Sequence, residues 1–191
     1  MTDYNAFTGG IEPGGLRTKN DIRILICYIL HSVHAPLSGE DLSGILQKKS
    51  LANYFEIQDA LSSLLKNGNI LKNESGEYQI GPGGKEIAEH LDDTLPLSVR
   101  DKALDAAMKM LARAKNEREH KVDILEDEDG HRVICHISGG DREMMSVSLS
   151  VPDILQAQIV KDNFHENPGG IYEVVLAALT NDKELGRKYF D

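Results

Sequence analysis

Cysteine, tryptophan and long apolar runs are scarce or missing in this sequence. It contains two cysteines and no tryptophan, and aromatic residues make up only 5% of its 191 positions. Two cysteines, Cys27 and Cys135, cannot build a disulfide framework, and in apolar segments such as theirs a free cysteine acts as a small hydrophobe. No apolar run approaches the roughly 18 residues that a membrane span needs, and residues 1–15 lack the pattern of a secretory signal. We therefore expect a cytoplasmic protein that does not enter a membrane.

An excess of basic residues is also missing. The chain has 21 Lys and Arg against 31 Asp and Glu, which gives a formal net charge of -10. Affinity for nucleic acid comes largely from Lys and Arg that displace counterions from phosphates. Any DNA-binding surface on this chain must therefore be a local basic patch, which dimerisation would double.

Residues 18–95 carry the pattern of a winged helix-turn-helix, after an N-terminal arm over residues 1–17 that we expect to be flexible. An apolar stripe at helical spacing predicts a first helix over 18–35. Ser38 with Asp41 has the spacing of a capping box and starts a second helix. A third helix starts at Asn53 and ends near Gly68, and its predicted buried side consists of Ile57, Ala60, Leu61, Leu64 and Leu65.

After Gly68 the spacing of apolar residues changes from a helical pattern to the alternation of strands. Residues 70–72 and 78–80 flank the turn sequence Asn73-Glu74-Ser75-Gly76, which predicts a hairpin. The glycines within 81–84 are expected to break the chain before a short helix that runs to Leu91. Three helices followed at once by a hairpin are typical of a winged helix-turn-helix.

A second, α+β unit is predicted after residue 95. Pro96 and Ser98 open a long connecting helix over 96–119. Three strands follow within the C-terminal domain, 120–191, and in the third Met145, Val147, Leu149 and Val151 alternate with serines, as in a sheet with one buried face. Two helices complete the domain, with Leu155, Ile159 and Phe164 predicted to face inward on one, and Ile171, Val174, Val175, Ala178 and Leu179 on the other. The predicted fold class is α+β, with a small antiparallel sheet packed by helices.

The string Asn53-Tyr54-Phe55-Glu56-Ile57-Gln58, the 70–80 hairpin, the long helix and the three strands resemble an uncharacterised bacterial family, domain-of-unknown-function family 4364. Gly170-Ile171-Tyr172 before the last apolar helix fits as well, so the resemblance covers about residues 19–179. It implies a winged-helix fold and a role as a transcriptional regulator. Gly81 departs from the family pattern, which usually has threonine after the second strand of the wing.

The third helix is the predicted reader of DNA, because a helix fits the major groove and presents its outer side chains to base edges. Tyr54 and Asn53 at its start could reach phosphates, as could Lys72 on the wing. Arg17, Lys19 and Arg23 form a further basic cluster. The predicted DNA-binding residues are Asn53, Tyr54, Gln58, Ser62, Ser63, Lys66, Lys72, Lys48 and Lys49. A solvated polar face is the plainer interpretation of this helix, and Glu56 and Asp59 make it less basic than a strong DNA reader.

One possible metal site stands out. Cys27, His31 and His34 are spaced by four and three residues in the first helix, and such residues ligate transition metals. No fourth ligand is evident, so an interface role for these side chains is the stronger interpretation and we expect no metal and no cofactor. No local motif ties a nucleophile to a base, so we expect no enzymatic activity.

Three functions remain open at this point. The first is a DNA-binding transcriptional regulator that acts as a homodimer and binds double-stranded DNA. The second is a winged-helix module that binds a protein and not DNA, which suits the charge of -10 better. The third is a regulator whose C-terminal domain senses a ligand in a pocket lined by the serine face of its third strand, Ser146, Ser148 and Ser150. The plainer alternative is that these serines face water.

Overall fold

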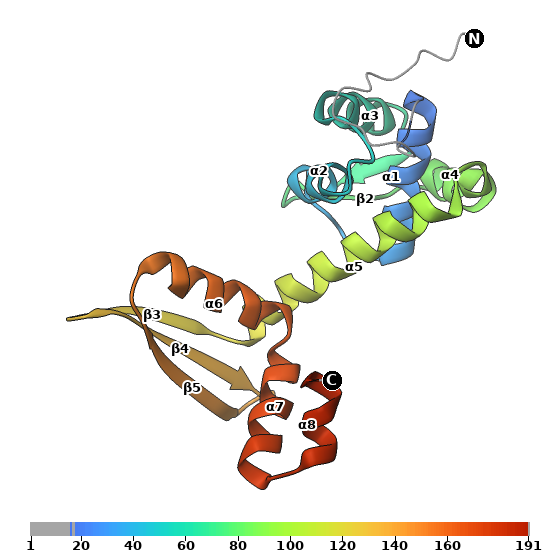
Figure 1. Cartoon of the computed structure of the whole chain (residues 1–191). Coiled ribbons are helices and arrows are strands. Elements are labelled where there is room, and N and C mark those ends of the chain that lie inside the picture. Colours follow the sequence, from blue (N-terminus) through green and yellow to red (C-terminus); the bar gives the residue numbers. More distant parts are fainter. Residues whose placement is uncertain (1–15, 17, 191) are drawn as a thin grey trace. The chain divides into compact units, whose positions relative to one another are not determined.

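The structure is a computed structural model that describes residue 16 and residues 18–190 of the chain. Helices are combined with one two-stranded and one three-stranded antiparallel sheet, which confirms the α+β class (Figure 1). The chain divides into two compact units, and the boundary between Met110 and Leu111 falls within helix α5 (Leu97–Glu119). Each unit is described below by itself.

The first unit opens with three helices, each begun by a capping side chain. Thr18 caps α1 by accepting a hydrogen bond from the backbone N–H of Asp21, a cap that the sequence pattern did not single out. Ser38 and Asp41 form the predicted capping box at the start of α2, at 3.0 and 2.9 Å. These bonds satisfy backbone donors that have no partner within the helix. The helices are α1 (Lys19–Val33), α2 (Gly39–Lys48) and α3 (Tyr54–Lys66).

A hairpin follows α3 directly. Its strands, β1 (Ile70–Lys72) and β2 (Tyr78–Ile80), have the predicted bounds, and Ile70 lies opposite Ile80. The connector between α1 and α2 also pairs with β2, because Leu37 and Tyr78 exchange two backbone hydrogen bonds, of 3.0 and 2.7 Å. The hairpin is thus held against the connector that leads into α2.

Helix α4 (Pro82–Leu91) begins inside the glycine-rich segment that was predicted to be a break. Pro82 occupies the first turn, where its missing N–H costs nothing. The glycines allow this turn to approach the backbone of Asn69, since a Cβ at Gly84 would lie 2.1 Å from the Asn69 carbonyl oxygen. The predicted break is therefore wrong, and the glycines serve close packing of α4 on the hairpin. A short 3₁₀ turn, η1 (Asp92–Thr94), then leads toward α5.

The core of the first unit consists of the apolar stripes of its helices. Every predicted stripe residue of α3 is buried except Leu65, which is exposed and corrects the sequence prediction. Helix α5 adds a narrow stripe at four-residue spacing, Val99, Ala103 and Ala107. Fully buried side chains of this core include Ile22, Leu25, Ile26, Ile29, Leu30, Leu37, Leu42, Leu46, Leu51, Ile57, Leu61 and Leu64.

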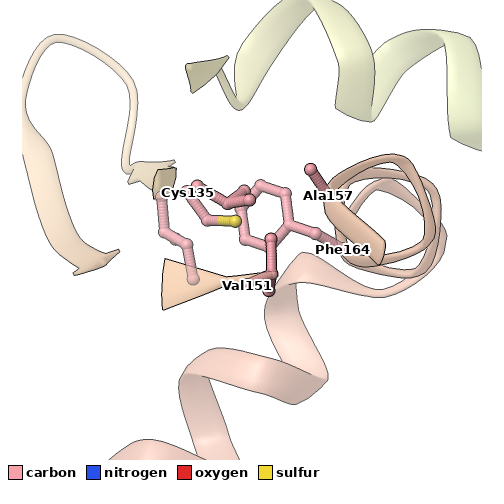
Figure 2. Close-up of a cluster of buried hydrophobic side chains, with 6 residues drawn as sticks. Cys135, Val151, Ala157 and Phe164 are labelled. Carbon is pink, nitrogen blue, oxygen red and sulfur yellow. The ribbon is translucent and has the colours of Figure 1, made fainter. Parts of the chain in front are cut away.

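The second unit contains a meander with the strand order β3-β4-β5. One face of this sheet packs on α6, where Ala157 and Phe164 lie against Cys135 and Val151 (Figure 2). The strands are β3 (Val122–Asp127), β4 (Gly130–Ser138) and β5 (Glu143–Val151), and the helices are α6 (Ile154–Glu166), α7 (Pro168–Thr180) and α8 (Lys183–Phe190).

Several side chains of the second unit that were predicted to face inward are exposed. Leu155 and Ile159 on α6 and Leu179 on α7 lie in solvent, while Phe164 is buried as predicted. The small sheet offers too little surface to cover the full apolar width of both helices, so part of each stripe stays open. In the part of the chain that the structure describes, no helix combines the length and apolar character of a membrane span.

Candidate nucleic-acid interface

Helix α3 presents one side to solvent, opposite the stripe that it buries. Asp59, Ser62 and Lys66 are exposed along this side, and Ser63 at its border is half-buried. Tyr54 is exposed at the start of the helix. The N-cap Asn53 is half-buried, and its side-chain oxygen accepts a hydrogen bond from the N–H of Phe55. Asn53 therefore fixes where α3 begins, and with it the position of the first exposed side chains.

Gln58, a predicted base reader, is engaged inside the unit. Its Nε2 donates to the Oγ of Ser43, a buried residue of α2, at 3.1 Å. The hydroxyl of Ser62 donates to the backbone carbonyl of Gln58 at 2.9 Å. The bond to Ser43 links α3 to α2, so the amide of Gln58 already has a partner within the unit.

The two acidic residues of α3 are both paired with one cation. The Nζ of Lys19, at the start of α1, lies 3.1 Å from Oδ2 of Asp59 and 3.6 Å from Oε2 of Glu56. The hydrogen bond with Asp59 and the charges of both carboxylates raise the pKa of Lys19. Lys19 therefore stays protonated throughout the neutral range, and the negative charge of α3 is compensated locally.

The other predicted lysines have different surroundings. Lys49 lies 3.7 Å from a carboxylate oxygen of Asp105 on α5, so its charge is partly compensated. Lys72 on the hairpin lies over the ring of Tyr78, at 5.4 Å from the ring centre. Lys48 and Lys66 are exposed and form no ion pair with any residue that the structure describes. Of the predicted basic cluster, Arg17 lies outside the described residues and Arg23 is half-buried.

Phe55 is a residue at this surface that was not among the predicted contacts. Its side chain is 74% exposed and its ring meets that of Tyr54 edge to face, with 5.8 Å between centres. The sequence contained a signal for the exposure of this side chain. Phe55 precedes Ile57 by two residues, about 200° around a helix, which puts it away from the buried stripe.

The metal candidate of α1 is not assembled. Cys27 is fully buried, and burial raises the pKa of its thiol to about 12. His31 lies 3.9 Å from a carboxylate oxygen of Glu89, and its ring is 5.8 Å from that of His34. No cluster of three metal-ligating side chains occurs among residues 16 and 18–190. The arrangement fits an ordinary core cysteine beside two surface histidines.

The serine face of β5 is open. Ser146, Ser148 and Ser150 are all exposed, which is the wet-face alternative of the sequence analysis. Their cross-strand neighbours on β4 are His136, Ile134 and Arg132. His136 bridges two carboxylates, with Nδ1 2.6 Å from Glu143 and Nε2 3.3 Å from Asp123. The face is thus polar, and it also carries the ion pair of Arg132 with Asp127.

Comparison with known proteins identifies a family and no individual relative. No curated protein and no solved structure matches the sequence. A family described as domain of unknown function, DUF4364, matches residues 22–179, which include all the helices and strands described above from α2 to β5. Since that match spans most of the 191 residues, the chain belongs to the DUF4364 family.

Proposed function

We propose that the first unit is a winged helix-turn-helix that binds double-stranded DNA with α3 in the major groove, within a homodimeric transcriptional regulator. Helices α2 and α3 would form the helix-turn-helix, and the β1–β2 hairpin would be the wing. A dimer would place two α3 helices on two half-sites about one DNA turn apart. Such pairing adds phosphate contacts, which a chain with a net charge of -10 needs.

The observation that carries this proposal is the charge arrangement around α3. Glu56 and Asp59 would repel phosphates, but Lys19 compensates both of them. Lys48 and Lys66 are exposed without an acidic partner among the described residues, so they remain available for phosphates. The local surface can therefore be less negative than the overall charge suggests.

Within this proposal the residues have different roles. Lys66 and Lys48 would contact phosphates, and Lys72 would do so from the wing. Ser62 would face base edges or sugars from the exposed side of α3, and Tyr54 would reach phosphates from the start of the helix. Gln58 would mainly hold α3 on α2, because its amide already donates to Ser43.

The direct test is selection of genomic DNA fragments by the purified full-length chain, followed by titration of an enriched fragment at several salt concentrations. We expect binding that weakens steeply as salt rises, because cation–phosphate contacts release counterions. Lys66→Glu should abolish it. Lys102→Glu, which adds the same charge at an exposed position of α5, is the matched control and should bind nearly as well as the unaltered chain.

Two results would contradict the proposal. One is the absence of any enriched fragment. The other is equal affinity of Lys66→Glu and Lys102→Glu for an enriched fragment, which would mean that α3 does not carry the contact.

Phe55 favours a second candidate function, docking of a protein. A large aromatic side chain that is 74% exposed beside Tyr54 is the type of group that anchors protein interfaces. Salt separates the two functions, since apolar docking is insensitive to salt while DNA binding is not. A Phe55→Ala variant that keeps full DNA affinity but loses a salt-insensitive protein partner would favour docking.

A further inference from the structure

Strand β5 lies at one edge of the three-stranded sheet, and beyond its first residue, Glu143, it lacks the charges and prolines that normally protect an edge. Natural edge strands are kept from pairing by charges, prolines or short length. From Met144 to Val151 the strand has no charged residue and no proline. The opposite edge strand, β3, is shorter and contains Asp123, Glu126 and Asp127.

The backbone groups on the open edge can be assigned from the register. The N–H of His136 donates to the carbonyl of Lys121, so the even-numbered residues of β4 direct their backbone groups toward β3. The odd-numbered residues of β4 therefore face β5, where Cys135 lies opposite Val147. Since neighbouring residues in a strand alternate in direction, the N–H and C=O of Ser146, Ser148 and Ser150 point to the open edge. No strand pairs with them in the described part of the chain.

The apolar side chains of β5 are also incompletely covered. On the core face of β4, Val133, Cys135 and Ile137 are buried. Met145 and Leu149, which are their neighbours on β5, are only half-buried. The helices above the sheet therefore leave the β5 side of the core partly open.

We propose that β5 pairs antiparallel with β5 of a second copy of this chain, about a twofold axis at Ser148. In this register Ser148 lies opposite its own copy, and Ser146 lies opposite Ser150 of that copy. Each serine pair exchanges two backbone hydrogen bonds, about six in all. The two sheets become one continuous sheet, and the dimer that forms supplies the interface for the homodimer on which the proposed function rests.

A second copy is the occupant that this edge fits best, because the strand is complementary to itself. In an antiparallel pair centred on Ser148, even-numbered residues lie opposite even-numbered residues and odd-numbered ones opposite odd-numbered ones. Serines therefore lie opposite serines, and Val147 lies opposite Leu149 of the second copy. On the core face, the apolar side chains of each β5 strand then lie beside those of the other copy. In a chain with a net charge of -10, two copies can also approach most readily where the strand carries no charge.

Sedimentation of the full-length chain over a range of concentrations tests this pairing. We expect a dimer for the unaltered chain and a monomer, with about half the mass, for Ser148→Lys, because two ammonium groups would face each other across the axis. Leu125→Lys puts the same charge at an exposed position of the other edge strand and should remain a dimer. Circular dichroism should show that both variants are folded.

Hydrogen exchange tests the pairing without any substitution. The amides of Ser146, Ser148 and Ser150 should exchange slowly at concentrations where the chain is a dimer and fast on dilution. A monomer at every concentration, a Ser148→Lys variant that is still a dimer, or fast exchange of these amides in a dimer would each overturn the proposal.

The DNA experiment separates this inference from the proposed function. A dimer that is lost in Ser148→Lys but selects no DNA fragment would support the β5 interface and refute DNA binding. A monomer that selects DNA fragments would support DNA binding and refute the β5 interface. Loss of the dimer on Leu179→Glu but not on Ser148→Lys would place the interface on the exposed side of α7 and contradict pairing through β5.

Discussion

Lys19 and Asp59 are 40 positions apart in the sequence, yet the Nζ of the one lies 3.1 Å from Oδ2 of the other. The contact joins the first turn of α1 to the exposed side of α3, and the same ammonium group lies 3.6 Å from Glu56. Lys19 therefore reduces the negative charge that α3 presents to a ligand. Because Lys19 and Asp59 are exposed to solvent, we expect their pairing to affect binding more than stability.

Replacing Lys19 or Asp59 should change DNA affinity in opposite directions. Lys19→Gln removes the positive charge beside both carboxylates and should weaken binding severalfold, whereas Asp59→Asn removes one negative charge and should strengthen it. Titration of an enriched DNA fragment by fluorescence anisotropy measures both. Lys102→Gln is the control for loss of an exposed lysine elsewhere in the first unit. Equal affinities of Lys19→Gln and Lys102→Gln would show that the pairing has no role in binding.

The capping box at the start of α2 should contribute measurably to the stability of the first unit. Ser38→Ala removes the acceptor for the N–H of Asp41, so we expect the free energy of unfolding to fall by about 1 kcal/mol. Ser38→Thr keeps an acceptor and should lose less. Urea unfolding followed by circular dichroism measures the change, with Ser75→Ala at the exposed turn of the hairpin as the control. A Ser38→Ala midpoint equal to that of Ser75→Ala would contradict this prediction.

Two glycines should respond oppositely to the same substitution. Gly84→Ala would place a Cβ 2.1 Å from the carbonyl oxygen of Asn69, so α4 must move and stability should fall by about 1–3 kcal/mol. Gly44 lies within α2 with nothing near its missing Cβ, so Gly44→Ala should raise stability by about 0.5–1 kcal/mol. Urea unfolding of both variants gives the comparison. A Gly84→Ala variant with the same free energy of unfolding as the unaltered chain would mean that α4 does not pack closely on the hairpin.

Local sequence patterns predicted most of the secondary structure correctly. Both strands of the hairpin have the expected bounds, because alternation and a four-residue turn depend only on neighbouring residues. The capping box of α2 is local in the same sense. Helix α8 was missed although Asp182 caps it, accepting hydrogen bonds from the N–H groups of Glu184 and Leu185. Asn181-Asp182 was thus a usable signal for a new helix.

The contacts that shape the candidate site could not be predicted in this way. The pairing of Lys19 with Asp59 and the bridge between Leu37 and Tyr78 join residues about 40 positions apart, and no local pattern encodes them. Burial was overestimated for a similar reason. An apolar residue such as Leu155 completes a helical stripe, but whether another element covers it depends on the packing of the whole unit.

Cys27 should make the chain sensitive to alkaline pH. Burial holds the pKa of its thiol at about 12, against an ordinary value of 9.0 once the chain unfolds. Between these values the unfolded thiol loses its proton and the folded one keeps it, so ionisation stabilises the unfolded state. The stability present below pH 9 should therefore decline as the pH rises toward 12.

Unfolding by urea from about pH 8 to about pH 10.5 tests this in the unaltered chain and in Cys27→Ala. The variant should be less stable at every pH, because a small cavity replaces the sulfur, but its stability should fall less steeply with rising pH. The difference between the two slopes reports the ionisation of the Cys27 thiol, because tyrosines and lysines titrate alike in both proteins. Parallel slopes would mean that Cys27 ionises as easily in the folded chain as in the unfolded one. The thiol would then be accessible, and the metal site with His31 and His34 would have to be reconsidered.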